Sequence, residues 1–190
     1  MECRRTWLGR SLGRVRRART RGRGAGSPAR ARYWPAMSQE NVEQENVRVV
    51  LEGFARYNAV EGGLEWRLRT LPEVMATYWQ PEAEYHTDSR DPDSAIHRGI
   101  DAITRHFANW FEAYPDLKVE PVEAKASGDK VFVWLRFSGH GAGSKVPIEM
   151  ELAHVITLRD RKWARTVEYA DKAQALEAVG LSEQDAHANP

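Results

Sequence analysis

The chain has 190 residues and a single cysteine, Cys3, and its 28 Lys and Arg residues nearly balance its 27 Asp and Glu residues. Eleven of the basic residues but only one acidic residue lie in residues 1–36, so residues 37–190 hold 17 basic against 26 acidic residues, a formal net charge of −9, which argues against a nucleic-acid partner there. The length fits one domain, and a segment without cysteine can form neither a disulfide nor a thiolate site.

The hydropathy pattern predicts a cytoplasmic protein with no membrane partner. No apolar run approaches the roughly 20 residues of a membrane-spanning helix. The N-terminus also lacks the unbroken apolar stretch of a secretory signal, and a domain without cysteine needs no oxidising compartment.

Residues 1–36 form an Arg/Gly-rich extension that we expect to be disordered, because its few apolar residues are too scattered to offset the entropy of folding. An arginine-rich nucleic-acid arm and an organelle transit peptide both fit this composition. A third hypothesis, which the abrupt change in composition favours, is that Met37 is the native start and residues 1–36 are not translated. The predicted domain is therefore 37–190.

The first half of this domain reads mainly as helix. Apolar residues at spacings of three and four predict a helix over Asn41–Asn58. After Gly63 a second helical region begins, and Thr70, with Pro72 in the first turn, predicts a break there and a separate helix that ends near residue 79. A short strand is expected over Ala83–Asp88, followed by a loop at 89–93.

The second half changes from helical to alternating periodicity. An apolar stripe from Ile100 to Tyr114 predicts the main packing helix. Four strands follow, predicted at Lys118–Ala126, Lys130–Ser138, Pro147–Arg159 and Trp163–Ala170. A last helix is expected between an Asp171 cap and Gly180, with Leu181 folding back over its end. This order predicts an α+β fold in which one curved sheet, antiparallel or mixed, wraps around the N-terminal helices and encloses an apolar pocket.

His154 is the one polar residue on the apolar face of its predicted strand. An imidazole so placed suits acid–base catalysis, although a core histidine bonded to a backbone carbonyl is an equally simple interpretation. A three-residue turn after Arg159 would pair His154 with Glu168, whereas a two-residue turn would pair it with Val167 and send Glu168 to the other face. Arg161 fits poorly in a two-residue turn, which favours the His154–Glu168 pair.

Further candidates for the pocket wall are polar or aromatic residues on the predicted helices and strands. They are Tyr78, Trp79, His86, Asp88, Phe107, Trp110 and Trp134. Most of these side chains can equally be core residues, because aromatic stripes at helical spacing usually indicate packing. The sequence contains no His-Glu-x-x-His motif, no cysteine pair and no calcium-binding loop, so no metal is predicted.

Four segments together resemble a known family: Glu84-Tyr85-His86-Thr87-Asp88, His97-Arg98-Gly99, Ala153 to Asp160, and Val167-Glu168-Tyr169-Ala170-Asp171. Their order is similar to that of the SnoaL-like polyketide cyclase branch of the nuclear-transport-factor-2-like superfamily, over nearly all of residues 37–181. The resemblance implies a cone-shaped α+β fold, often dimeric through its sheet, and no cofactor. One such fold hosts many functions.

The same resemblance implies a catalytic pair of His154 and Glu168, since the cyclases use a strand histidine and an acid on the next strand. Their acid is aspartate, so glutamate is a departure from the pattern. The tyrosine of the ketosteroid isomerases falls on Gly53, and the Arg-x-Asp tripeptide of limonene-type epoxide hydrolases is absent. The expected protein is a cofactor-free cyclase or isomerase acting on a small apolar or aromatic carbonyl compound. The alternative is a noncatalytic module that binds a ligand or dimerises.

Overall fold

A computed structural model describes residues 38–59, 63–90, 94–182 and 184. The expectations for residues 1–36, whether disorder, a nucleic-acid arm or an untranslated leader, lie outside the described residues. Within the described part of the chain, four helices and six strands form an α+β fold, and no helix is long and apolar enough to cross a membrane.

The first two helices lie against the sheet and one another. Helix α1 spans Gln39–Asn58, and the side chain of Ser38 caps it by accepting a hydrogen bond from the Asn41 amide. Helix α2 spans Gly63–Tyr78 without the break that was predicted at Thr70 and Pro72. That prediction was wrong because the Thr70 hydroxyl donates back to the Trp66 carbonyl oxygen (3.0 Å) instead of capping a new helix.

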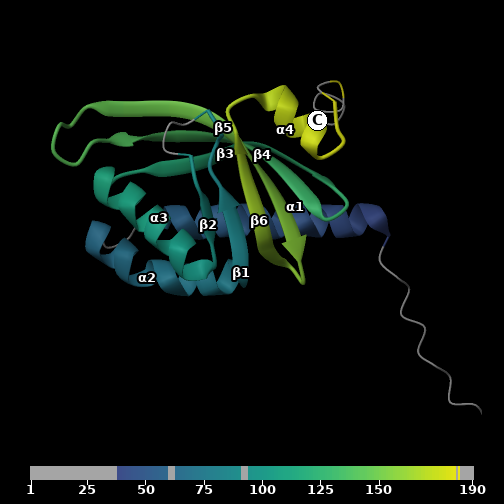
Figure 1. Cartoon of the computed structure of the whole chain (residues 1–190), viewed down its shortest axis with the longest axis horizontal. Helices are drawn as coiled ribbons and strands as arrows, with labels where there is room; N and C mark the ends of the chain where they lie inside the picture. The colour runs from purple at the N-terminus through teal and green to yellow at the C-terminus, as the bar shows by residue number, and fades with distance from the viewer. Residues whose placement is uncertain (1–37, 60–62, 91–93, 183, 185–190) are drawn as a thin grey trace, which may run out of the picture. The chain divides into compact units, whose positions relative to one another are not determined.

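The remaining elements follow in the predicted order with one addition. They are β1 (Trp79–His86), β2 (Ile96–Arg98), α3 (Ile100–Ala113), β3 (Lys118–Ser127), β4 (Lys130–His140), β5 (Pro147–Arg159), β6 (Lys162–Tyr169) and α4 (Lys172–Ala178). The three-residue strand β2 was not predicted. The strands lie in the order β2-β1-β6-β5-β4-β3, and all neighbours are antiparallel except β1 and β6, which are parallel (Figure 1). The sheet is therefore mixed.

Alternation along the strands gives the sheet two apolar faces. The inner face packs against α1, α2 and α3 and forms the main core, with Val133 and Leu135 of β4 fully buried. The outer face forms a smaller core in which Phe132 and Val155 pack against α4. Helix α4 thus covers the face opposite the other helices, and Figure 1 shows it across the sheet from α2 and α3.

The cap of α4 follows the sequence-based prediction closely. The Asp171 side chain accepts a hydrogen bond from the Gln174 amide at 3.0 Å. Gly180 adopts a φ of 77°, which favours glycine, and the Leu181 amide then donates to the Leu176 carbonyl oxygen. Both ends of this helix are confirmed.

The turn between β5 and β6 has two residues, not the three that we expected. Arg159 pairs with Lys162, and both Asp160 (φ 52°) and Arg161 (φ 61°) adopt the left-handed conformation. A two-residue turn alone would place Glu168 on the outer face, but β6 carries a bulge at Ala164, which has no partner on β5. The extra residue shifts the register by one.

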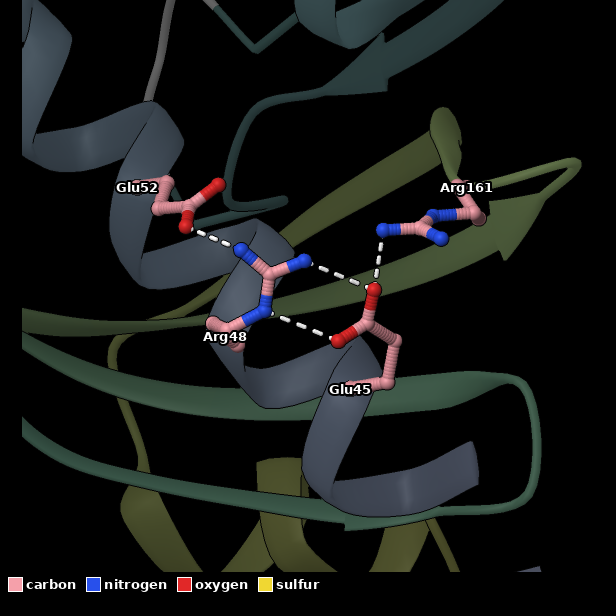
Figure 2. A network of polar contacts seen from close by, with 4 residues as sticks. All are labelled: Glu45, Arg48, Glu52 and Arg161. Atoms are coloured by element: carbon pink, nitrogen blue, oxygen red, sulfur yellow. Dashed lines mark hydrogen bonds and ion pairs between the residues drawn. The ribbon is translucent and has the colours of Figure 1, made fainter. Parts of the chain in front are cut away.

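An ion-pair network holds this turn against α1 (Figure 2). The Arg161 guanidinium binds the carboxylate of Glu45, which also accepts hydrogen bonds of 2.7 and 2.8 Å from Arg48, and Arg48 in turn binds Glu52. Arg161 therefore gains a partner in the strained conformation that the two-residue turn demands.

Candidate functional site

A cavity of about 430 Å³ lies between the inner face of the sheet and the helices α1 and α3. Most of its wall is aromatic. Phe54 and Tyr57 of α1, Phe107 and Trp110 of α3, Phe137 of β4 and Trp163 of β6 all contribute to it. Leu117, Val119, Met150 and Leu152 add aliphatic surface. A concave, mainly apolar site of this size suits a small organic ligand.

Polar side chains converge on one part of the wall. The bulge in β6 makes His154 and Glu168 direct cross-strand partners, and His154 Nε2 lies 3.6 Å from Glu168 Oε1. The Tyr85 hydroxyl of β1 lies between them: it donates to Glu168 Oε1 and is 3.2 Å from His154 Nε2. Since the hydroxyl has one proton and gives it to Glu168, its oxygen accepts from His154, which puts a proton on Nε2.

The second carboxylate oxygen of Glu168 is also bound, because the backbone amide of Asp88 donates to Oε2 at 3.1 Å. Burial alone would raise the pKa of Glu168, but His154, Tyr85 and the Asp88 amide together lower it below its ordinary value. The apolar pocket therefore does not raise the pKa of Glu168 toward neutrality. Burial, with the charge of Glu168, raises the pKa of Tyr85 well above its ordinary range, so its hydroxyl stays protonated.

Asp88 anchors the end of β1 beside the cavity. Its carboxylate accepts hydrogen bonds from the side chain and amide of Arg90 (2.8–3.1 Å) and from the amide of Ala170. The bond to the Arg90 side chain is the main reason that the pKa of Asp88 falls to about 2. An ionised carboxylate with these partners orients the strand ends and cannot donate a hydrogen bond to a ligand.

Five of the predicted residues line the cavity: His154, Glu168, Asp88, Phe107 and Trp110. Tyr78 and Trp79, which were predicted beside them, do not. Trp79 is fully buried behind the wall, where its indole packs on Trp163 and donates to the Tyr57 hydroxyl at 3.2 Å. Tyr78 ends α2 and lines a separate, smaller pocket together with Arg56.

His86 and Trp134 were also predicted in the pocket wall, and both lie on the outer face of the sheet. Tyr85 points inward, so its neighbour His86 points outward and contacts Glu84 at 2.8 Å. On β4, Val133 and Leu135 point inward, so Trp134 points outward and donates to Glu151 at 3.3 Å. Alternation places both side chains away from the cavity.

Tyr85 and His106 are polar residues of the wall that were not predicted. Tyr85 and His86 are neighbours on β1, so only one of the two side chains can face the cavity. The prediction took His86 as the inward residue, whereas Tyr85 is. His106 lies three residues after Ile103 and four before Trp110, so the helical stripe of α3 includes it. The centroid of its ring lies 4.3 Å from the ring centroid of His97 on β2 and 5.2 Å from that of Tyr85.

Across the described part of the chain, no group of three or more His, Cys, Asp or Glu side chains is arranged to hold a metal ion. A carboxylate, an imidazole and a phenol lie together at one end of the cavity.

The family follows from the sequence itself. The profile of the SnoaL-like domain matches residues 66–166, which is more than half of the chain and includes β1 to most of β6. The chain belongs to the SnoaL-like family. The matched segment contains His154 and ends two residues before Glu168. No curated protein matches this SnoaL-like protein.

Solved structures share its fold at low sequence identity. A SnoaL-like polyketide cyclase candidate from Jannaschia sp. CCS1 is 23% identical with a TM-score of 0.58, and the match covers 82% of this chain and all of that one. A ketosteroid isomerase-like protein from Catenulispora acidiphila, in complex with trimethylamine, is 18% identical with a TM-score of 0.53 over 72% and 95% of the chains. TerC, crystallised with polyporic acid, is 17% identical with a TM-score of 0.53 over 71% and 97%. This SnoaL-like protein thus has a nuclear-transport-factor-2-like fold.

Proposed function

We propose that the cavity binds a small apolar or aromatic carbonyl compound and that Glu168 and His154 carry out acid–base catalysis on it without a cofactor, as a cyclase or isomerase does. One observation carries the proposal: the carboxylate and the imidazole meet, with Tyr85, at the polar end of a cavity whose remaining wall is mainly aromatic and aliphatic.

In this proposal Glu168 removes a proton from a carbon next to the carbonyl group. The proton goes to the carboxylate, and the electron pair of the broken C–H bond moves onto the carbonyl oxygen as an enolate. An isomerase returns the proton from Glu168 to another carbon. In a cyclase the enolate carbon attacks a second carbonyl of the same molecule, the π bond of that carbonyl breaks, and its oxygen takes up the proton held by Glu168. A base positioned in this way typically contributes about 10²–10⁴-fold in rate.

The lowered pKa of Glu168 has two consequences for this chemistry. The carboxylate is charged at neutral pH and needs no prior deprotonation, but it is a weaker base than an unpaired one. His154 assists by holding a proton on Nε2 beside the Tyr85 hydroxyl and the Glu168 carboxylate. As donors to the enolate oxygen, Asp88 is excluded because it is ionised and Tyr78 because it lies outside the cavity, so we assign this role to the indole of Trp110.

The test is exchange of acidic C–H protons for deuterium in aromatic 1,3-diketones, followed by NMR in D₂O. Wild-type protein should accelerate the exchange, and Glu168→Gln and His154→Ala should each lower the acceleration by at least about 100-fold. His86→Ala, which removes a histidine from the outer face, is the matched control. If both site variants only lower the melting temperature and leave exchange and ligand affinity intact, the catalytic proposal fails.

A noncatalytic ligand-binding or dimerisation module is the alternative. The neighbours crystallised with trimethylamine and with polyporic acid support ligand binding by this fold without requiring catalysis. Binding of aromatic ketones that survives in both site variants, with no exchange in any of them, favours this alternative.

We also propose that residues 37–190 form a cytoplasmic homodimer through the outer face of the sheet. Half-exposed Arg136 and Glu151, which pair at 3.0 Å beside Trp134, lie on that face and could contact a second copy. Sedimentation equilibrium of the full chain tests the dimer, and Trp134→Glu should dissociate it. A monomeric wild type would refute it.

A further inference from the structure

Glu168 differs in its partners from Asp88 and Glu151, the other acidic residues that border the cavity. Asp88 is paired with Arg90 at 3.0 Å, and the side chain of Glu151 points to the outer face of the sheet, where it is paired with Arg136 at 3.0 Å. The ion pair described for Glu168 is with His154 alone, and its other partners are the Tyr85 hydroxyl and the Asp88 amide. No guanidinium or ammonium group of a described residue therefore offsets its charge directly.

The surroundings strengthen the field of this carboxylate. Only 15% of the Glu168 side chain is exposed, and the space in front of it is bounded mainly by aromatic rings. Charges interact more strongly in such a low-dielectric cavity than in water. An anionic group that enters is repelled, whereas a cation is attracted both by the carboxylate and by the faces of aromatic rings.

Arg90 is the one described Lys or Arg residue in the cavity wall, and it offers little to an anion. Its guanidinium donates through Nε and Nη2 to both oxygens of Asp88. Its side chain is also 57% exposed, so solvent screens its remaining charge. The charge of this one Lys or Arg residue of the described wall is thus offset by Asp88.

We propose that the cavity accepts uncharged and positively charged aromatic ligands and rejects carboxylates, and that Glu168 sets this selectivity. The natural ligand is then a ketone, an ester or an amine on a flat aromatic body, not a free carboxylic acid. This inference rests on the proposed function in placing the ligand in the same cavity, but it concerns binding and not catalysis.

Three probes with one naphthalene body test the proposal by calorimetric titration at pH 8: 2-acetylnaphthalene, 2-naphthylmethylamine and 2-naphthoate. The ketone should bind, the amine should bind at least as tightly, and the carboxylate should bind about tenfold more weakly than the ketone, or worse. In Glu168→Gln the three affinities should converge, because the variant keeps the shape of the side chain and removes its charge.

Glu84→Gln is the matched control, since Glu84 lies on the outer face of β1 beside His86, and it should leave the order of affinities unchanged. Naphthoate binding as tightly as the ketone overturns the proposal, as does a charge order that persists in Glu168→Gln. A preference for naphthoate that disappears in Arg90→Met would assign selectivity to Arg90 instead. If the charge order appears but no proton exchange is seen, the catalytic proposal fails and this one stands.

Discussion

The two ends of the cavity are held together by different interactions. At the aromatic end, Trp163 packs against Phe54, Tyr57 and Trp79 with ring centroids 5.1–6.4 Å apart, and the contacts are almost entirely apolar. At the polar end, Glu168 of β6 accepts hydrogen bonds from the Tyr85 hydroxyl of β1 and the Asp88 amide, and it forms an ion pair with His154 of β5. The stability of the aromatic end should depend on side-chain volume, whereas the stability of the polar end should depend on charge and pH. Substitutions at the two ends should therefore have different effects.

Gly53→Ala should give the largest loss of stability, at the aromatic end. A Cβ at this position would lie 2.7 Å from Cζ2 of Trp163, whose ring is buried and surrounded. Overpacking of this kind costs about 1–3 kcal/mol, more than alanine gains over glycine in a helix. Urea denaturation measures the change. Gly143→Ala, where no atom lies near the added Cβ, is the control, and equal losses in both variants would contradict the packing argument.

Tyr85→Phe should act at the polar end, with a loss of about 1–2 kcal/mol for a buried hydrogen bond to a carboxylate. The pKa of Glu168 should rise, because one of the groups that lower it is removed. Carboxyl ¹³C NMR titration measures that pKa directly. Tyr57→Phe removes a hydroxyl that contacts Met75 and Trp79 instead, and it should leave the pKa of Glu168 unchanged.

Asp88→Asn should change the response to acid. The pKa of Asp88 is lowered from 3.8 to about 2, so its stabilising effect is complete above about pH 4 and is lost as pH falls toward 2. This shift corresponds to at most about 2 kcal/mol, and less because Arg90 is exposed. Melting temperatures should fall less steeply between pH 4 and 2 in the variant than in the wild type. Asp129→Asn, in the turn between β3 and β4, should keep the wild-type slope.

Arg161 should show the smallest effect, because its ion pair with Glu45 lies outside the cavity and is exposed. Arg161→Gly loses this pair but removes the strain of a positive φ, so its stability should stay within about 0.5 kcal/mol of the wild type. Arg161→Ala loses the pair and keeps the strain, so it should be about 1 kcal/mol less stable than the glycine variant. Equal stability of the two variants would show that the turn is unstrained.

Periodicity and cap residues predicted most of this fold. The α3 stripe, the strands β3 to β6 and the cap of α4 by Asp171 depend on local patterns, and all were confirmed. The unbroken α2 and the short β2 were not predicted. In the first, the Thr70 hydroxyl bonds back within the helix instead of capping a new one. In the second, a three-residue strand depends on its pairing with β1, which no local pattern reveals.

The candidate site was harder to predict, because it depends on which alternate residues of each strand face inward. His154 follows from its apolar neighbours, but the β1 segment has no comparable pattern, and His86 was chosen where Tyr85 faces the cavity. For Glu168 the expected pairing occurs for another reason: a two-residue turn and a bulge at Ala164 together have the effect of a three-residue turn. A bulge without glycine leaves no clear mark in a sequence.

The face on which Glu168 lies therefore depends on whether the number of residues between it and Arg159 is even or odd. Deleting Ala164 alone would leave the turn intact yet rotate every later side chain of β6 to the opposite face, and the carboxylate would leave the cavity. Adding one residue to the turn at the same time would bring it back. Homologues of this chain can therefore exchange a residue between turn and strand while keeping the same acid opposite the same histidine, so hairpin length alone is a poor guide to which relatives retain the pair.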